Sequence, residues 1–171
     1  SGCYTITVPE GSKTMIGALA GGKLSNLNIY GKKIDGYGVV EYYYVDRSNP
    51  VKAEIDNVTL KSGSHTKYSG FIGGYASGVD VVLIRNCTVE AGVIIGDDGT
   101  IPEWAEELET SYPFPWGPSN VQYNDMIGSF AGAFNGTIEN CVSHAKVYGR
   151  KFVGGILGFK GQSMGDCIVR N

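Results

Sequence analysis

Six acidic residues are the first candidates for catalysis in this chain of 171 residues. They are Asp80, Glu90, Asp97, Asp98, Glu103 and Asp125. Glycoside hydrolysis needs two carboxyl groups about 5–10 Å apart, one to donate a proton and one to act as base or nucleophile. Closeness in sequence does not establish that distance, and Asp97-Asp98-Gly99 is typical of a turn. A polysaccharide-active enzyme, either a lyase or a glycoside hydrolase, is therefore kept as the alternative function.

Other catalytic and metal-binding patterns are missing from the sequence. His65 and His144 are far apart in the chain, and no Gly-x-Ser-x-Gly elbow accompanies them. Asp97, Asp98 and Glu103 do not fit the twelve-residue EF-hand pattern, and no two cysteines have the short spacing of a zinc site. We therefore predict that the protein binds no metal and no cofactor. The missing patterns favour a protein that is not an enzyme.

Aromatic residues are concentrated in two segments, and flat side chains with polar groups are enriched at recognition surfaces. An insertion at about 97–120 contains both tryptophans and four of the six prolines. In the other segment, alternation along Val39–Val45 places Tyr42 and Tyr44 on one face of a strand. The predicted ligand-binding residues are Trp104, Tyr112, Phe114, Trp116, Tyr42 and Tyr44. The open alternative is that these rings, and Tyr37 with them, pack against the rest of the molecule.

The elements that would position these residues follow from an internal repeat. Short apolar runs, glycine-containing corners and an Asn before a small or apolar residue recur together. The Asn position is occupied by Asn26, Asn57, Asn86, Asn140 and Asp166, with steps of 31, 29, 54 and 26 residues. Apolar runs of this length indicate strands, and periods of 20–50 residues indicate stacked repeats. The sequence predicts an all-β parallel β-solenoid of about five coils of about 26–31 residues, with one step about a coil too long.

Two columns of side chains should then run through the stack. The Asn side chains are expected to stack at about 4.8 Å, or else Asn simply tolerates a left-handed bend. The cysteines are expected to follow in the next position as buried free thiols. The predicted structural ladder comprises Asn26, Asn57, Asn86, Asn140, Asp166, Cys87, Cys141 and Cys167. Cys3 is assigned to the same position in an incomplete first copy.

Composition limits the partners. The length fits one domain over residues 1–171, and the net charge of -3 provides no basic surface for nucleic acid. No apolar run approaches the roughly 20 residues that a membrane-spanning helix needs. The chain begins Ser-Gly-Cys-Tyr without a signal peptide, and its last copy ends without a polar cap. We therefore expect neighbouring domains of a longer parent chain.

The repeat resembles a known motif. Ile127-Gly-Ser-Phe-Ala-Gly132 with Gly136-Thr-Ile-Glu-Asn-Cys-Val142, and Val153-Gly-Gly-Ile-Leu-Gly158, are similar to the GLUG repeat of bacterial surface proteins such as IgA-specific metallopeptidases. The resemblance covers about two thirds of the chain and implies a right-handed parallel β-helix. It does not bring peptidase activity with it, because His-Glu-x-x-His is absent.

These observations predict a non-catalytic module of a secreted or cell-wall-attached bacterial protein. It would act as an adhesin or spacer and bind a host glycan or surface protein through the aromatic insertion at 97–120. A purely structural spacer, with both tryptophans buried, is the third possibility.

Overall fold

The computed structural model describes residues 3–43, 52–71, 82–96, 125–134, 136–149, 151–160 and 166–171. Within these ranges the chain forms short β-strands joined by turns, and no helix occurs. The prediction of an all-β protein is confirmed for this part of the chain. The predicted insertion at 97–120 lies outside the described residues.

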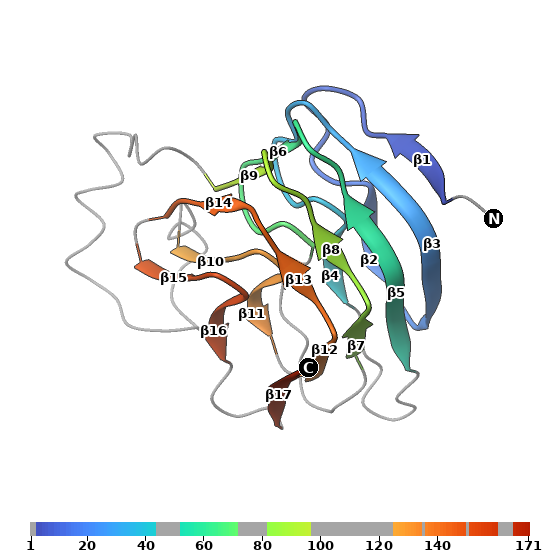
Figure 1. The fold of residues 1–171 in the computed structure, drawn as a ribbon, viewed down its shortest axis with the longest axis vertical. Coiled ribbons are helices and arrows are strands. Elements are labelled where there is room, and N and C mark those ends of the chain that lie inside the picture. The colour runs from blue at the N-terminus through green and yellow to red at the C-terminus, as the bar shows by residue number, and fades with distance from the viewer. Residues whose placement is uncertain are drawn as a thin grey trace.

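The largest sheet places its strands side by side in the order in which they occur in the chain (Figure 1). Its path runs through β1 (Tyr4–Thr7), β3 (Gly22–Tyr30), β5 (Ala53–Leu60), β7 (Val82–Arg85), β12 (Gly136–Glu139) and β17 (Cys167–Arg170). Two short strands, β8 (Thr88–Val89) and β13 (Val142–Ser143), belong to the same sheet. Every pair in this sheet is parallel, as the repeat requires of equivalent segments.

The described strands also form four smaller parallel groups. Three strands form one of them, in the order β14 (Lys146–Val147), β9 (Ile94–Ile95) and β6 (His65–Thr66). The others are pairs, namely β2 (Ile16–Leu19) with β4 (Val40–Tyr43), β10 (Asp125–Gly128) with β15 (Lys151–Gly154), and β11 (Ala131–Phe134) with β16 (Leu157–Lys160). Each copy of the repeat therefore contributes strands to more than one sheet.

The register of the largest sheet shows where the long step of the repeat places its additional residues. Ile55 pairs with Ile84, and Ile84 pairs with Ile138, so β7 and β12 are direct neighbours. The long step between Asn86 and Asn140 therefore does not hold an extra strand of this sheet. The additional length falls between β9 and β10, where the aromatic insertion is located in the sequence.

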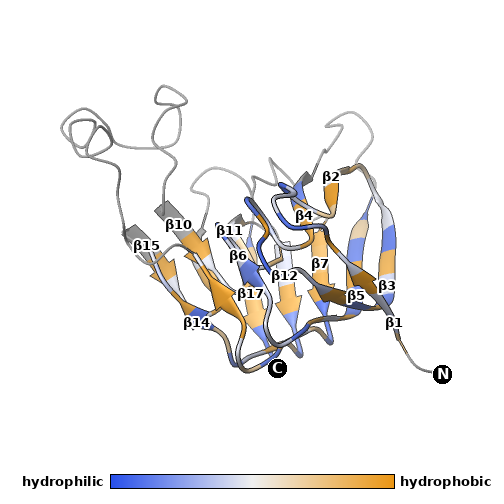
Figure 2. Ribbon diagram, turned by 90° about the horizontal axis from the view of Figure 1, so that it is seen from above, coloured by the Kyte–Doolittle hydropathy of each residue, from blue (hydrophilic) through white to orange (hydrophobic). Residues whose placement is uncertain are grey.

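The core is built from strands whose side chains alternate between buried and outward-facing positions. This alternation shifts by one residue at the Asn of a repeat copy. Figure 2 shows apolar and polar residues alternating along β3 and β5. In β5, Ala53 and Ile55 are buried, and the next buried residue is Val58 rather than residue 57. Asn57 lies between them with a φ of 53°, which shifts the phase of the side chains and bends the strand. Leu60 thereby also points inward.

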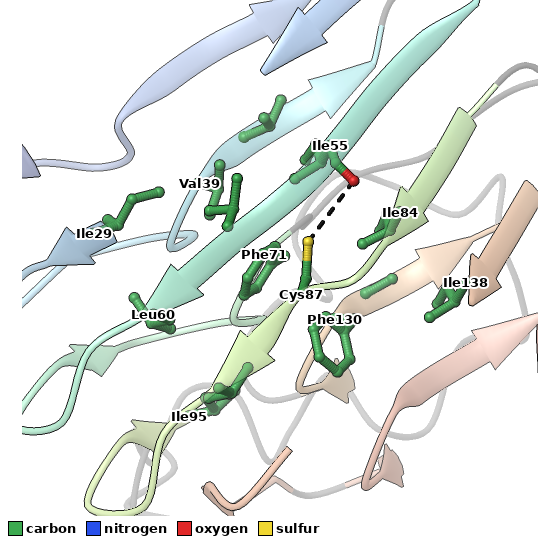
Figure 3. Close-up of a cluster of buried hydrophobic side chains, with 14 of the residues drawn as sticks. Ile29, Val39, Ile55, Leu60, Phe71, Ile84, Cys87, Ile95, Phe130 and Ile138 are labelled. Atoms are coloured by element: carbon green, nitrogen blue, oxygen red, sulfur yellow. Dashed lines mark hydrogen bonds between the residues drawn. The ribbon is translucent and has the colours of Figure 1, made fainter. Parts of the chain in front are cut away.

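The same shift organises the next copy. Ile84 and Cys87 are both fully buried, on either side of the Asn86 bend. In the close-up the Cys87 sulfur lies among the side chains of Ile55, Phe71 and Phe130 (Figure 3). The rings of Phe71 and Phe130 have centroids 5.0 Å apart, as favourable aromatic pairs do.

Glycine allows neighbouring copies to come close. The Gly38 N–H donates to Ser69 O, and the Gly70 N–H donates to Gly128 O, both at 3.2 Å. A Cβ on Gly38 would lie 1.8 Å from Gly70 O, and one on Gly70 would lie 2.2 Å from Ser129 O. These positions therefore require glycine because backbone of the adjacent copy occupies the space of a side chain.

Candidate functional site

The predicted carboxylates do not form a catalytic pair in the described part of the chain. Asp80, Asp97, Asp98 and Glu103 lie outside it, and Asp125 begins β10. Glu90 binds Lys61 through Oε1 and accepts the Ser62 N–H at 2.9 Å through Oε2. These two contacts, Lys61 first, hold the pKa of Glu90 below its usual range. Glu90 is therefore kept ionised, and it stabilises the turn at Lys61-Ser62.

The structure brings together two other carboxylates, which the sequence analysis did not consider. Glu54 and Asp56 project from the same face of β5. Lys23 Nζ lies 2.7 Å from Asp56 and 3.3 Å from Glu54. Arg85 lies 3.2 Å from Asp56 and 2.5 Å from Glu54. Both carboxylates are thus shared by two cations from the strands on either side.

This cluster is unsuited to proton donation. The pKa of Asp56 is lowered by the hydrogen bond from Lys23, then by one from Asn86 at 2.8 Å, and by the charge of Arg85. A general acid needs a raised pKa, which burial or a second negative charge would provide. Cations dominate here instead, and the pKa of Lys23 is raised in return by Asp56. The cluster therefore acts as a structural ion-pair network.

The charged column continues to the last strand of the sheet. The register aligns Asp56 with Arg85, Arg85 with Glu139, and Glu139 with Arg170. Arg170 donates to Glu139 Oε2 through Nε at 3.0 Å and Nη2 at 2.8 Å. Signs alternate at four successive positions, so each in-register neighbour has the opposite charge.

Four of the predicted ladder residues share a backbone conformation. Asn26, Asn57, Asn86 and Asn140 all have φ between 51° and 59°. Their amides also meet in part, since Asn57 Nδ2 donates to Asn26 Oδ1 at 2.8 Å and Asn140 Nδ2 to Asn86 Oδ1 at 3.4 Å. Asn86 Nδ2 donates to Asp56 instead of Asn57. Asn in this column therefore combines a left-handed bend with an interrupted amide ladder.

Asp166 and Cys167 do not belong to the two columns. Cys167 pairs with Gly136 and Arg170 with Glu139, which brings Asn171 beside Asn140. The Asn140 N–H accordingly donates to Arg170 O at 3.0 Å. This part of the predicted ladder is wrong, because an Asp-Cys pair resembles Asn-Cys locally but pairs five residues out of phase.

Cys3 is displaced as well. Tyr4 pairs with Leu27, so Cys3 lies beside Asn26 rather than in the column that follows it. Asn28 Nδ2 donates to Cys3 O at 3.4 Å. The prediction that every cysteine occupies the same position is therefore wrong for Cys3 and for Cys167.

Cys87 and Cys141 do lie in adjacent positions of one column. The pairs Arg85–Glu139 and Thr88–Val142 have the same offset, which aligns the two cysteines between them. Both are free thiols. Their mutual hydrogen bond, together with burial of Cys87, raises the pKa of Cys87, and the same hydrogen bond lowers the pKa of Cys141. Cys87 therefore stays protonated and packs as a small apolar residue.

The predicted aromatic contacts fall mostly outside the described residues. Trp104, Tyr112, Phe114, Trp116 and Tyr44 are among those not described. Tyr42 lies in β4, opposite Ala18 of β2. Half-buried Tyr37 packs against Tyr68, with ring centroids 5.2 Å apart, and burial raises the pKa of Tyr37 to about 12. Tyr37 is therefore a packing residue.

A small pocket was missed by the sequence analysis. It has a volume of about 160 Å³ and is lined by Lys33, Ile34, Asp35, His65 and Lys67. His65 Nε2 lies 3.1 Å from Gly96 O, which selects the tautomer with a proton on Nε2. The available signal was the spacing, because Lys-x-Asp at 33–35 is followed one repeat later by His-x-Lys at 65–67.

Within the described ranges, no group of three or more His, Cys, Asp or Glu side chains is arranged to hold a metal ion. In the same ranges there is no helix with the length and apolar character to span a bilayer. Comparison of the chain with protein-family models, curated proteins and solved structures finds no match.

Proposed function

We propose that the chain is a non-catalytic surface module of a secreted or cell-wall-attached bacterial protein, folded as a right-handed parallel β-helix of the GLUG-repeat kind with about five coils. It binds a host glycan or surface protein through the aromatic insertion at 97–120. Neighbouring domains of the parent chain are its other partners, and it acts as an adhesin or spacer.

The observation that carries this proposal is the unbroken pairing around the insertion. β7 pairs with β12, β8 with β13, and β9 with β14, although the chain between β9 and β10 is long. The strands on the two sides of the insertion thus pair directly with one another. A long segment between directly paired strands that is rich in aromatic and proline residues is well suited to recognition.

The charged residues support a binding module over the polysaccharide-active enzyme. Glu54 and Asp56 are shared by Lys23 and Arg85, and Glu90 is held by Lys61. The pKa values of Asp56 and Glu90 are lowered, whereas hydrolysis of a glycoside needs one carboxyl group with a raised pKa. None of these three described carboxylates is suited to that role.

Replacement of residues 97–120 by a short Gly-Ser linker tests the function. Binding to mucin, immunoglobulin and a host-glycan array should be lost, while circular dichroism retains the β signal. The double variant Trp104→Ala/Trp116→Ala should lower affinity by about tenfold or more, because buried aromatic anchors dominate many interfaces. Unchanged binding by both variants would remove the insertion from the function.

A further inference from the structure

Two free thiols, those of Cys87 and Cys141, occupy the same position in two successive strands of the largest sheet. The Arg85–Glu139 pair fixes the register just before the two cysteines. Just after them, the Val142 N–H donates to Cys87 O at 3.0 Å. Cys141 is therefore the direct neighbour of Cys87 across parallel strands.

The two sulfur atoms point in the same direction. Cys87 Sγ lies 3.0 Å from Arg85 O, and Cys141 Sγ lies 3.2 Å from Glu139 O. Each sulfur also lies near a carbonyl oxygen of an isoleucine one strand earlier, at 3.7 Å for Cys87 (Figure 3) and 3.8 Å for Cys141. The second sulfur thus has the surroundings of the first, moved by one strand. The two side chains project side by side and do not diverge.

The spacing of the two residues suits a disulfide. Neighbouring strands of a sheet are about 4.8 Å apart, and the Cα atoms of bridged cysteines are usually about 4.4–6.8 Å apart. The Cβ atoms of a disulfide are about 3.5–4.5 Å apart, so the strands need to approach by only a few tenths of an ångström. A bond formed with such slight strain is open to reduction.

The other two cysteines lie too far from this pair. Cys167 pairs with Gly136, which is five residues before Cys141 in the chain. Five residues of strand cover about 17 Å. Cys3 precedes β1, which is separated from β7 by β3 and β5, or about 14 Å. The fold therefore brings one pair of cysteines within reach of each other.

The surroundings of the two thiols give them different roles. Cys141 is partly exposed, whereas Cys87 is fully buried. Their mutual hydrogen bond lowers the pKa of Cys141, and the same bond, together with burial, raises the pKa of Cys87. The thiolate is the nucleophilic form of cysteine. Cys141 is therefore the thiol that reacts first with an oxidant from solvent, and Cys87 is the resolving thiol beside it.

We propose that Cys87 and Cys141 are a site of disulfide formation that joins the copies of the repeat on the two sides of the insertion at 97–120. The oxidant is a low-molecular-weight disulfide. The Cys141 thiolate attacks one sulfur of the oxidant, which gives a mixed disulfide and releases a thiolate. Cys87 then attacks Cys141 Sγ, and its proton goes to the second thiolate as it leaves. The cysteines lose two electrons and two protons, and the oxidant becomes two thiols.

The inference goes beyond the proposed function, from which it takes only the oxidising surroundings of a secreted protein. It requires no glycan and no host protein. The bond would connect positions 54 residues apart in the chain, and such a cross-link stabilises a fold by restricting its unfolded state.

Peptide mapping after oxidation tests the pairing. The folded protein is treated with oxidised glutathione, remaining thiols are alkylated, and the chain is digested with trypsin and a glutamate-specific protease. Peptide 86–90 should be joined to peptide 140–146, with two hydrogen atoms fewer than their sum. Oxidation in urea should instead give a mixture of pairings. The absence of this linked peptide from the folded protein, or links mainly to Cys3 or Cys167, would overturn the proposal.

Variants test the order of the two steps. Cys87→Val, which repeats the residue that β5 has at Val58, should take up one glutathione at Cys141 and stop there. Cys141→Ser should leave Cys87 unmodified, because Cys87 is buried. The matched control Cys3→Ser/Cys167→Ser should form the linked peptide within about twofold of the original rate. A stable glutathione on Cys141 of the unmodified protein would show that the second step fails, against the proposal.

Thermal unfolding measures the effect of the bond. The oxidised protein should melt several degrees above the protein reduced with dithiothreitol, and Cys87→Val should melt at one temperature in both conditions. Equal melting temperatures of the oxidised and reduced unmodified protein would overturn the stabilising role of the bond.

The protein with residues 97–120 replaced by a linker separates this inference from the proposed function, because it keeps both cysteines. It should lose ligand binding and still form the disulfide. Loss of binding without disulfide formation would overturn the inference alone. Disulfide formation with unchanged binding would support the inference and count against the proposed function.

Discussion

Two outer surfaces of the protein use charge in opposite ways. On the largest sheet, Asp56, Arg85, Glu139 and Arg170 alternate in sign from strand to strand, and Asp56 pairs with Arg85 as Glu139 does with Arg170. Beside β6, the pocket collects two lysines and a histidine around Asp35. Both surfaces arise from the same alternation of inward and outward side chains along parallel strands.

The difference teaches how to separate structural charges from candidate binding groups. In the first surface each charge lies next to an opposite charge, and the network stabilises the register. In the second, two lysines and a histidine surround one aspartate. Substitutions on the first surface should therefore lower stability more than substitutions on the second.

The largest effect on stability is expected from replacing Asn57, which bends strand β5 of the largest sheet. Asn57→Ala should lower the free energy of unfolding by about 1–2 kcal/mol, because an alanine in the left-handed region is strained and the amide bond to Asn26 is lost. Asn57→Gly should cost less, since glycine adopts this conformation freely. Urea denaturation measures both. Equal losses for the two variants would show that the hydrogen bond, and not the bend, is what matters.

A smaller effect should follow removal of one cation from each surface. Arg85→Ala leaves Glu54 and Asp56 with Lys23 alone, and we expect a loss of about 1 kcal/mol in the free energy of unfolding. Lys33→Ala should change it by less than about 0.5 kcal/mol. Thermal unfolding of both variants at low salt measures the contrast. A larger loss for Lys33→Ala would reverse the comparison between the two surfaces.

The smallest effect is a dependence on pH. The pKa of Asp56 in the folded protein lies below its ordinary value of 3.8, mainly through Lys23. Its contribution to stability is therefore fully present above about pH 4, and it disappears as the pH falls through the folded pKa. Asp56→Asn should be less stable than the unmodified protein at pH 7, and this gap should narrow between pH 4 and 2. A gap of constant size would exclude the ion pair as its cause.

Much of the fold could be predicted because its signals are local. Asn adopts the left-handed backbone region at a lower conformational cost than most residues. The sequence therefore indicates a bend at each of Asn26, Asn57, Asn86 and Asn140, whichever strands they pair with. Short apolar runs predicted the strands. The register at the end of the chain could not be predicted in this way. Asp166-Cys167 matched the local pattern, but the ion pair of Arg170 with Glu139 accompanies a different pairing.

The candidate sites show the same difference between local signals and contacts made only in the folded chain. The sequence left open whether Tyr37 packs against the rest of the molecule, because its burial against Tyr68 is a property of the folded chain. The pocket was missed because Lys33 and His65 are separated by about one copy of the repeat, and their meeting depends on the Ile34–Thr66 bridge.

The sequence by itself determined that the protein is all-β, where its chain bends, and the approximate period of its repeat. These features depend on the preferences of short segments, namely side-chain alternation and the backbone freedom of Asn and Gly. Only the tertiary structure decided that β7 lies next to β12, that Cys167 meets Gly136, and that Lys33 faces His65. Those contacts join residues about 30 to 55 positions apart, and many sterically similar registers compete for them until packing and charge select one.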